Sequence, residues 1–180
     1  MILSAIFKKF LINRSFSINN GQIKLFGKMF WTLLPAKSLA MTYQKIAEKN
    51  GPKFLYDLGY EAGHDAAVEM MKSMQLKLKG GWISLNAVLA MLDFIGFGKV
   101  EFTERKIEKD GHHHLKIKVT DNPVIENAKK MFGSKSMVCN WFLGVYSAHA
   151  NMDLGTKNAH FKENKCFSTR HPHCEWETVW

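Results

Sequence analysis

The sequence predicts an α+β fold, in which helices pack on one side of a mostly antiparallel sheet. Several segments repeat apolar residues at the spacing of a helix, whereas Leu115, Ile117 and Val119 alternate with polar residues as in a half-buried strand. Turn residues at Asn20-Gly21 and near residue 170 indicate a hairpin toward each end of the chain. Long helices combined with hairpins rather than βαβ units favour this class.

Length and composition favour one globular domain. The 180 residues are 46% hydrophobic and 23% charged, which suffices for a core and is not typical of disorder. No apolar run approaches the roughly 20 residues of a membrane span, and Lys8-Lys9 interrupts the apolar N-terminal stretch, so we expect neither a span nor a signal peptide. Three cysteines, an odd number, argue against a secreted disulfide scaffold. We therefore expect a cytoplasmic protein.

The net charge of +9 raises the possibility of nucleic-acid binding. The basic residues are, however, scattered from Lys8 to Arg170, and no helix interleaves basic with aromatic residues. The charge therefore indicates a solvated basic surface, and we expect no direct contact with nucleic acid.

The first elements are a hairpin and two helices. Asn20-Gly21 separates two short strand-like segments, and we expect the second strand to run on to Trp31. Pro35 suits the first turn of a helix that ends at Asn50-Gly51-Pro52. The next helix, 53–74, carries the small residues Gly59, Ala62, Gly63 and Ala66 on one face. Because interior glycine costs about 1 kcal/mol, this face predicts a very close helix partner, either within the chain or in a dimer.

The middle of the chain continues with a buried helix and two strands. Ser84 can cap a helix that is apolar nearly all round up to Ile95. Strands are expected at 100–107 and 115–119, followed by a short helix that Asp121-Asn122-Pro123 opens. Between the strands, His112-His113-His114 is expected at a solvated hairpin tip rather than in a metal site.

The last quarter of the chain contains all three cysteines. Cys139 lies in an apolar helical segment, whereas Cys166 and Cys174 flank the turn signal Arg170-His171-Pro172-His173. If the chain folds back there, the two cysteines stand opposite each other with Cβ atoms roughly 5 Å apart. They would then be close enough to share a metal or to form a disulfide.

Glu163 completes a possible set of four zinc ligands, Cys139, Glu163, Cys166 and Cys174. Positions 163 and 166 point to opposite faces of a regular strand, so this set requires a bulge near Asn164-Lys165. From the residues alone, three buried cysteines that act as small hydrophobic side chains are the simpler interpretation.

Two stretches resemble the 4-vinyl reductase domain family, which occurs in aromatic-sensing bacterial activators and in archaeal proteins described as hydrocarbon-binding. The segment from Leu55 to Gly63 resembles the glycine-spaced second helix of the family. The segment from Cys139 to Gly144, followed by Glu163-Asn164-Lys165-Cys166 and by Cys174, resembles its C-terminal signature. The resemblance begins near Lys28.

The resemblance implies a fold like that of the transport-particle (TRAPP) subunits. Residues 28–180 would form a small-molecule-binding domain, and residues 1–27 an N-terminal extension with the start of the hairpin. A structural zinc ion on the four ligands and a homodimer through the first two helices are also implied. The ligand would be a small hydrophobic or aromatic molecule.

A pocket in this fold would lie between the apolar helix ending at Ile95, a face of the Cys139 helix and the sheet. The expected ligand contacts are Trp82, Trp141, Phe142, Val145 and His149, with Trp82 and His149 as the polar contributors. Charged metabolites would be excluded, because burial of an unpaired charge is costly.

The sequence therefore predicts a non-enzymatic binding or sensing domain that passes its signal to a separate partner. No nucleophile with its base and no nucleotide-binding glycine motif is present. Three alternatives stay open: an enzyme or accessory in tetrapyrrole vinyl reduction, a thiol redox switch of Cys166 and Cys174, and an assembly subunit without a ligand.

Overall fold

The computed structural model describes residues 16–19, 22–25, 29–32, 34–74, 82–108, 111–156 and 158–180. The helices are α2 (Ala36–Asn50), α3 (Pro52–Met74), α4 (Trp82–Phe94), α5 (Pro123–Phe132) and α6 (Cys139–Leu154), with short 3₁₀ turns η1 (Gly133–Lys135) and η2 (Phe167–Thr169). The strands are β1 (Phe16–Asn19), β2 (Gln22–Leu25), β3 (Met29–Trp31), β4 (Lys99–Ile107), β5 (His113–Thr120), β6 (His160–Lys165) and β7 (Cys174–Val179).

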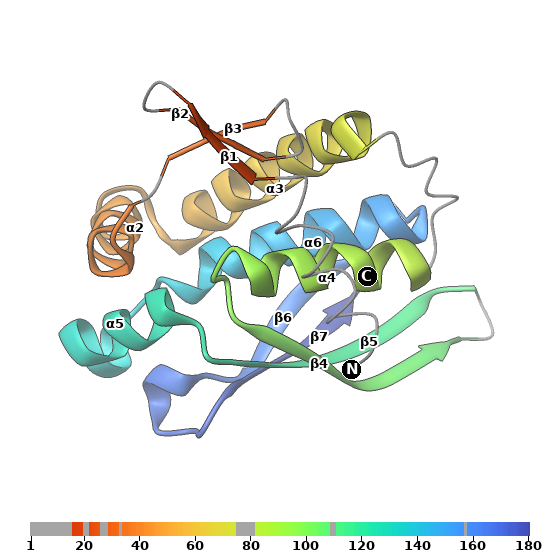
Figure 1. Cartoon of the computed structure of the whole chain (residues 1–180). Coiled ribbons are helices and arrows are strands. Elements are labelled where there is room, and N and C mark those ends of the chain that lie inside the picture. The colour runs from red at the N-terminus through yellow and green to blue at the C-terminus, as the bar shows by residue number, and fades with distance from the viewer. Residues whose placement is uncertain are drawn as a thin grey trace.

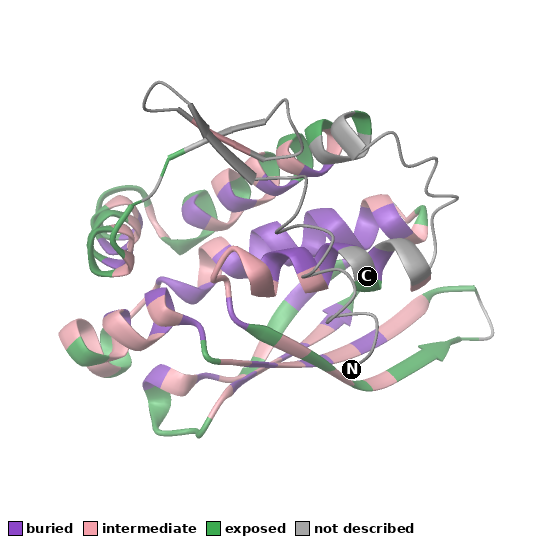
Figure 2. Cartoon of the chain, viewed as in Figure 1, coloured by how far each residue is buried: buried purple, intermediate pink, exposed green. Residues whose placement is uncertain are grey.

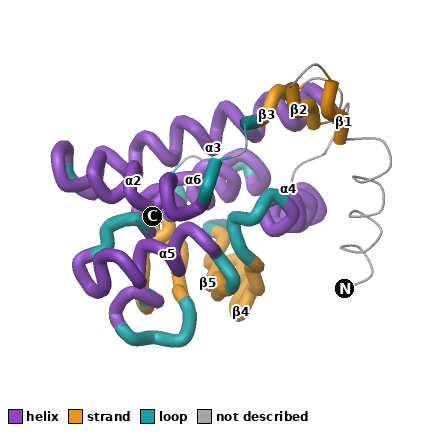
Figure 3. The backbone as a smooth tube through the Cα atoms, turned by 60° about the vertical axis from the view of Figure 1, so that its left-hand side comes forward, coloured by secondary structure: helices purple, strands orange, loops and turns teal. Residues whose placement is uncertain are grey.

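The main sheet has the order β4-β5-β7-β6, and all its pairs are antiparallel. Helices α4 and α6 lie over one face of this sheet, and α3 lies on top of α6 (Figure 1; Figure 3). The predicted α+β class is therefore confirmed. Within the described part of the chain, no helix combines the length and the hydrophobicity that crossing a bilayer requires.

Helix α6 lies at the centre of the molecule. Every residue from Phe142 to Asn151 is buried, and Figure 2 colours most of this helix purple. A helix that is apolar on all sides is stable only when protein surrounds it. Here α3 covers one side of α6, while the sheet and α4 cover the other.

Helices α3 and α6 approach each other backbone to backbone. A Cβ atom built on Gly59 would lie 3.0 Å from the carbonyl carbon of Trp141, and one on Gly144 would lie 2.6 Å from the backbone nitrogen of Tyr60. A Cβ atom on Gly63 would lie 2.8 Å from a backbone atom of α6. No real Cβ fits at these distances, so the close approach that glycine spacing predicted occurs within the chain.

The N-terminal strands form a separate small sheet, β1-β2-β3. Phe16 pairs with Leu25 and Asn19 with Gln22, which confirms the hairpin, although its turn residues lie outside the described part of the chain. The expected continuation of the second strand to Trp31 is wrong. β3 is instead a separate strand that pairs antiparallel with β2, on the edge opposite to β1.

Most other boundaries agree with the predictions, but α4 begins at Trp82 rather than behind a cap at Ser84. The ring of Trp82 packs edge-on against Phe102 at 6.1 Å and against His113 at 5.6 Å. These contacts with the sheet stabilise an additional half-turn, and local sequence carries no information about them.

Candidate functional site

Three separate parts of the chain bring four potential metal ligands together. Cys139 is the first residue of α6, Glu163 lies in β6, Cys166 directly follows β6, and Cys174 is the first residue of β7. One ligand atom from each residue lies within 4.8 Å of all the others. The structure therefore assembles the set that the sequence predicted, and this set could hold a metal ion.

A β-bulge makes this arrangement possible. Glu163 pairs with Trp176, but the next pair joins Lys165 to Glu175, so one residue of β6 has no partner. The extra residue reverses the alternation of side chains, and Glu163 and Cys166 consequently face the same side of the sheet. The bulge that the ligand set required is confirmed.

The sulfur atoms are too far apart for a disulfide, and their spacing is compatible with a shared tetrahedral metal ion. The Sγ atom of Cys139 lies 3.6 Å from that of Cys166 and 3.9 Å from that of Cys174. A disulfide bond is about 2.05 Å long. Two thiolates bound at about 2.3 Å to one tetrahedral zinc ion are separated by about 3.8 Å. The observed spacing matches the second geometry.

Hydrogen bonds from outside the cluster orient three of the four potential ligands. The indole Nε1–H of Trp176 donates to Glu163 at 3.2 Å. Backbone N–H groups of η2 donate to the sulfur atoms of Cys174 and Cys166, at 3.3 and 3.4 Å. Such donors stabilise negative charge on ligand atoms and fix their directions, as in established metal centres.

Burial and mutual proximity strongly perturb the ionisation of the cluster. Burial raises the pKa of Glu163 to about 7. Hydrogen bonds to the other two sulfur atoms raise the pKa of Cys139, whereas the hydrogen bonds that Cys166 accepts lower its pKa. The four groups cannot all ionise at this separation without a cation among them. Metal binding would therefore displace protons and strengthen as the pH rises.

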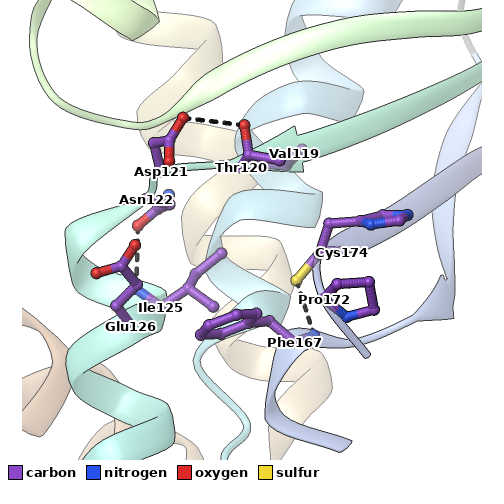
Figure 4. A pocket seen from close by; sticks show the side chains of 10 residues that line it. Val119, Thr120, Asp121, Asn122, Ile125, Glu126, Phe167, Pro172 and Cys174 are labelled. Carbon is purple, nitrogen blue, oxygen red and sulfur yellow. Dashed lines mark hydrogen bonds between the residues drawn. The ribbon is translucent and has the colours of Figure 1, made fainter. Parts of the chain in front are cut away.

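A cavity of about 190 Å³ borders this cluster (Figure 4). It lies between the end of β5, the start of α5 and the loop from η2 to β7, with Ile125, Phe167 and Cys174 in its walls. None of the five expected ligand contacts lines it. No sequence pattern predicted this cavity, because three segments far apart in the chain enclose it.

The expected ligand contacts lie at different interfaces. The ring of Trp141 stacks on Tyr43 of α2 at 4.5 Å, and the backbone of Val145 lies against α3. Phe142 is fully buried and meets Phe97 edge-on at 5.4 Å. Trp82 contacts the sheet instead, so the two tryptophans have different neighbours.

His149 is a buried histidine with an unsatisfied nitrogen. Its side chain is 2% exposed, and among the described residues its Nδ1 has no hydrogen-bond partner. Burial lowers the pKa of its imidazole to about 4, so the ring is neutral at neutral pH. It lies one helical turn from Tyr146, whose ring contacts Trp176 of the sheet.

This shift predicts a loss of stability in acid. An unfolded histidine binds a proton near pH 6.5, whereas folded His149 resists protonation until about pH 4. The stabilisation is therefore complete above pH 6.5 and is lost as the pH falls toward 4, by roughly 3 kcal/mol. The measurement is the difference in unfolding free energy between the wild type and His149→Leu from pH 4 to 7.5. A difference that does not change with pH would contradict the prediction.

Two residues that contact Trp82 at the start of α4, His113 and Arg105, were not among the predicted ligand contacts. The solvated tip predicted for the histidine run holds for His112, which is exposed. It is wrong for His113, because β5 already begins there and its ring faces Trp82. Arg105 of β4 lies over the same indole ring, at 5.2 Å from its centroid. Neither position stands out from its neighbours by residue type, and only the strand register identifies them.

Comparisons with known proteins show the fold. No protein-family model and no curated protein matches the sequence. The chain is similar to the phenol-responsive sensory domain of the transcription activator PoxR, solved with phenol: the TM-score is 0.73 at 19% identity, over 99% of this chain and 90% of that one. It is also similar to trafficking protein particle complex subunit 3 from Naegleria fowleri, covalently bound to palmitic acid, with a TM-score of 0.53 at 18% identity, over 79% and 93% of the two chains. The chain thus has the α+β fold of these two proteins.

Proposed function

We propose that the chain is a non-enzymatic domain of the 4-vinyl reductase type that binds a small apolar or aromatic molecule and holds a structural zinc ion. It would signal through a separate partner. The likeness to a phenol-responsive sensory domain over nearly the whole chain supports this function. The observation on this chain that carries it is the unsatisfied imidazole of His149.

An unsatisfied polar group in the core needs a reason. Leaving a buried donor or acceptor without a partner costs about 1–3 kcal/mol. His149 lies on α6 among the buried residues between α3 and the sheet, and its Nδ1 is free to bond with a ligand hydroxyl. A mostly apolar site with one orienting polar group is the usual chemistry of a small-molecule pocket. Trp82 remains the second proposed polar contact, and Trp141, Phe142 and Val145 remain the proposed apolar contacts.

Zinc would act structurally in this domain. Cys139, Glu163, Cys166 and Cys174 would fill all four positions of a tetrahedral ion, which leaves no position for substrate. Such a centre would tie the first residue of α6 to the hairpin of β6 and β7. Its contribution would be to folding free energy rather than to chemistry.

A homodimer through α2 and α3 is also part of the proposal. The glycine face of α3 is buried against α6, so the dimer would use the outward sides of these helices. Met41 and Phe54 are 40% and 48% exposed there. Light scattering of the wild type and of Phe54→Glu tests this interface, which is wrong if both proteins have the same mass.

The function is tested by a thermal-shift screen of phenols, fatty acids, porphyrins and nicotinamide cofactors. We expect phenols or hydrocarbon-like compounds to raise the melting temperature, with about 2.7 kcal/mol of added stability at a hundred times the dissociation constant. His149→Leu should weaken hydroxyl-bearing ligands about tenfold, whereas the control His64→Leu, on the exposed side of α3, should not. If only nicotinamide cofactors or polyanions stabilise the protein, the binding-module function is wrong.

A further inference from the structure

We propose that Arg105, with Trp82 and His113, binds the carboxylate group of an apolar ligand beside the start of α4. This rests on the proposed function and narrows its ligand class to monocarboxylates with an apolar body. In Figure 1 the start of α4 lies over the end of β4 and the start of β5. Trp82, the first residue of α4, contacts His113 of β5 and Arg105 of β4 there.

A β-bulge turns Arg105 toward the side of the sheet on which α4 packs. Phe102 pairs with Ile117, yet Arg105 pairs with Leu115, so the register shifts by one residue between them. Ile117 and Leu115 are 1% and 0% exposed and belong to the core side of the sheet. In an uninterrupted strand, position 105 would face the opposite, solvent side. Bulges that re-aim a side chain are common next to functional sites.

The guanidinium group of Arg105 rests on two aromatic rings. Its central carbon lies 5.2 Å from the ring centroid of Trp82 and 5.4 Å from that of Phe102. Cation–π contacts use the faces of the guanidinium plane and leave its N–H groups at the edge available. The rings therefore hold the arginine in place without consuming its hydrogen-bond donors.

Arg105 differs from the lysines of the same strand. Lys106 pairs with Glu104, and Lys99 pairs with Glu101 at 2.8 Å. No carboxylate of the described residues lies within ion-pair distance of Arg105. A guanidinium group that aromatic rings hold in place, and that has no anionic partner among the described residues, is suited to binding an external anion.

His113 adds a second polar group to the same place. Its ring centroid lies 5.6 Å from that of Trp82, and its buried Nδ1 has no hydrogen-bond partner among the described residues. The planar fork of Arg105 matches the two oxygen atoms of a carboxylate, and the imidazole N–H can donate to one of them. The indole ring of Trp82 would contact the apolar body of the ligand.

This site modifies the expectation that every charged molecule is excluded. That expectation concerned an unpaired charge in the interior. Arg105 is exposed, so a carboxylate here would be paired and partly hydrated while the apolar body packs on the indole ring of Trp82. Ligands with a charge in the middle of the apolar body would still be excluded.

The test is isothermal titration with matched pairs: 1-naphthoic acid against 1-naphthalenemethanol, and decanoic acid against decanol. Arg105→Gln removes the positive charge, and Arg105→Lys keeps the charge but lacks the planar guanidinium group. As a control, Lys106→Gln removes the neighbouring charge on the other side of the strand. We expect each acid to bind the wild type at least tenfold more tightly than its alcohol. Arg105→Gln should abolish that preference and leave alcohol binding within twofold, Arg105→Lys should keep part of it, and Lys106→Gln should keep all of it.

The outcomes separate this inference from the proposed function. If the alcohols bind the wild type as tightly as the acids, or if Arg105→Gln and Lys106→Gln act equally, the carboxylate site is wrong while the binding function stands. If neither acids nor alcohols bind, both are wrong. The melting temperatures of the variants are measured as well. Equal values show that a loss of binding does not result from unfolding.

Discussion

If the cluster holds the proposed zinc ion, replacing Cys174 by alanine is expected to abolish metal binding and to lower the free energy of unfolding by at least about 3 kcal/mol. The sulfur of Cys174 lies 3.9 Å from that of Cys139 and accepts a backbone hydrogen bond from η2. Its loss leaves only three ligands for a tetrahedral ion. It also leaves a gap at the start of β7, because the Cys174 side chain is only 1% exposed. Elemental analysis and denaturant unfolding, under reducing conditions and with or without a chelator, measure both effects.

The matched control is His173→Ala, one residue earlier. His173 offers an imidazole beside the cluster but is not among the four converging ligands. The control should therefore retain one metal ion per chain and most of the stability. Wild-type protein that is folded, reduced and metal-free would refute the zinc centre, and metal loss from His173→Ala would mean that the ligand set is different.

Gly144→Ala is expected to destabilise the protein by about 3 kcal/mol, at the upper end of the usual cost of overpacking. The new methyl group would collide with the carbonyl oxygen of Tyr56 and lie 2.6 Å from the backbone nitrogen of Tyr60. Backbone atoms inside a helix cannot rotate away as a side chain can. Helices α3 and α6 would have to separate, and the buried residues between them would lose contact.

Gly155→Ala, at the end of α6, serves as the control for this change. Nothing lies within 4 Å of the position of its added Cβ, so only its left-handed backbone, with φ of +68° and ψ of +25°, opposes the substitution. That strain costs about 1 kcal/mol. Equal unfolding free energies for the two variants, measured in denaturant, would show that α3 and α6 are not in close backbone contact.

The elements that the sequence predicted well are those in which burial alone produces the pattern. α3 and α6 must be apolar or small wherever they contact each other, and the sequence meets this requirement with Gly59 and Gly63. The cluster of potential metal ligands was predictable for another reason: all three cysteines lie in the last quarter of the chain, and their arrangement with Glu163 resembles the C-terminal signature of a known family. Even the bulge in β6 followed from the ligand set, because Glu163 and Cys166 could not otherwise face the same side.

Features that depend on the choice of partner were not predictable. Periodicity indicates that Trp141 and Phe142 face other parts of the protein. It does not show that Trp141, which is partly buried, stacks on α2 while Phe142 meets Phe97. The bulge in β4 leaves no mark in its own sequence, since it arises from the pairing of β4 with β5. From the sequence alone, Arg105 therefore could not be distinguished from other charged surface residues.

The close contact of α3 with α6 also limits how this domain can move. Two helices whose backbones interlock at glycines cannot slide along each other without separating first, so they move together as one rigid unit. Any molecule that pushes on the inner side of α6 displaces α3 by the same amount. The solvent-facing side of α3 would then report on events at the sheet, roughly two helix diameters away.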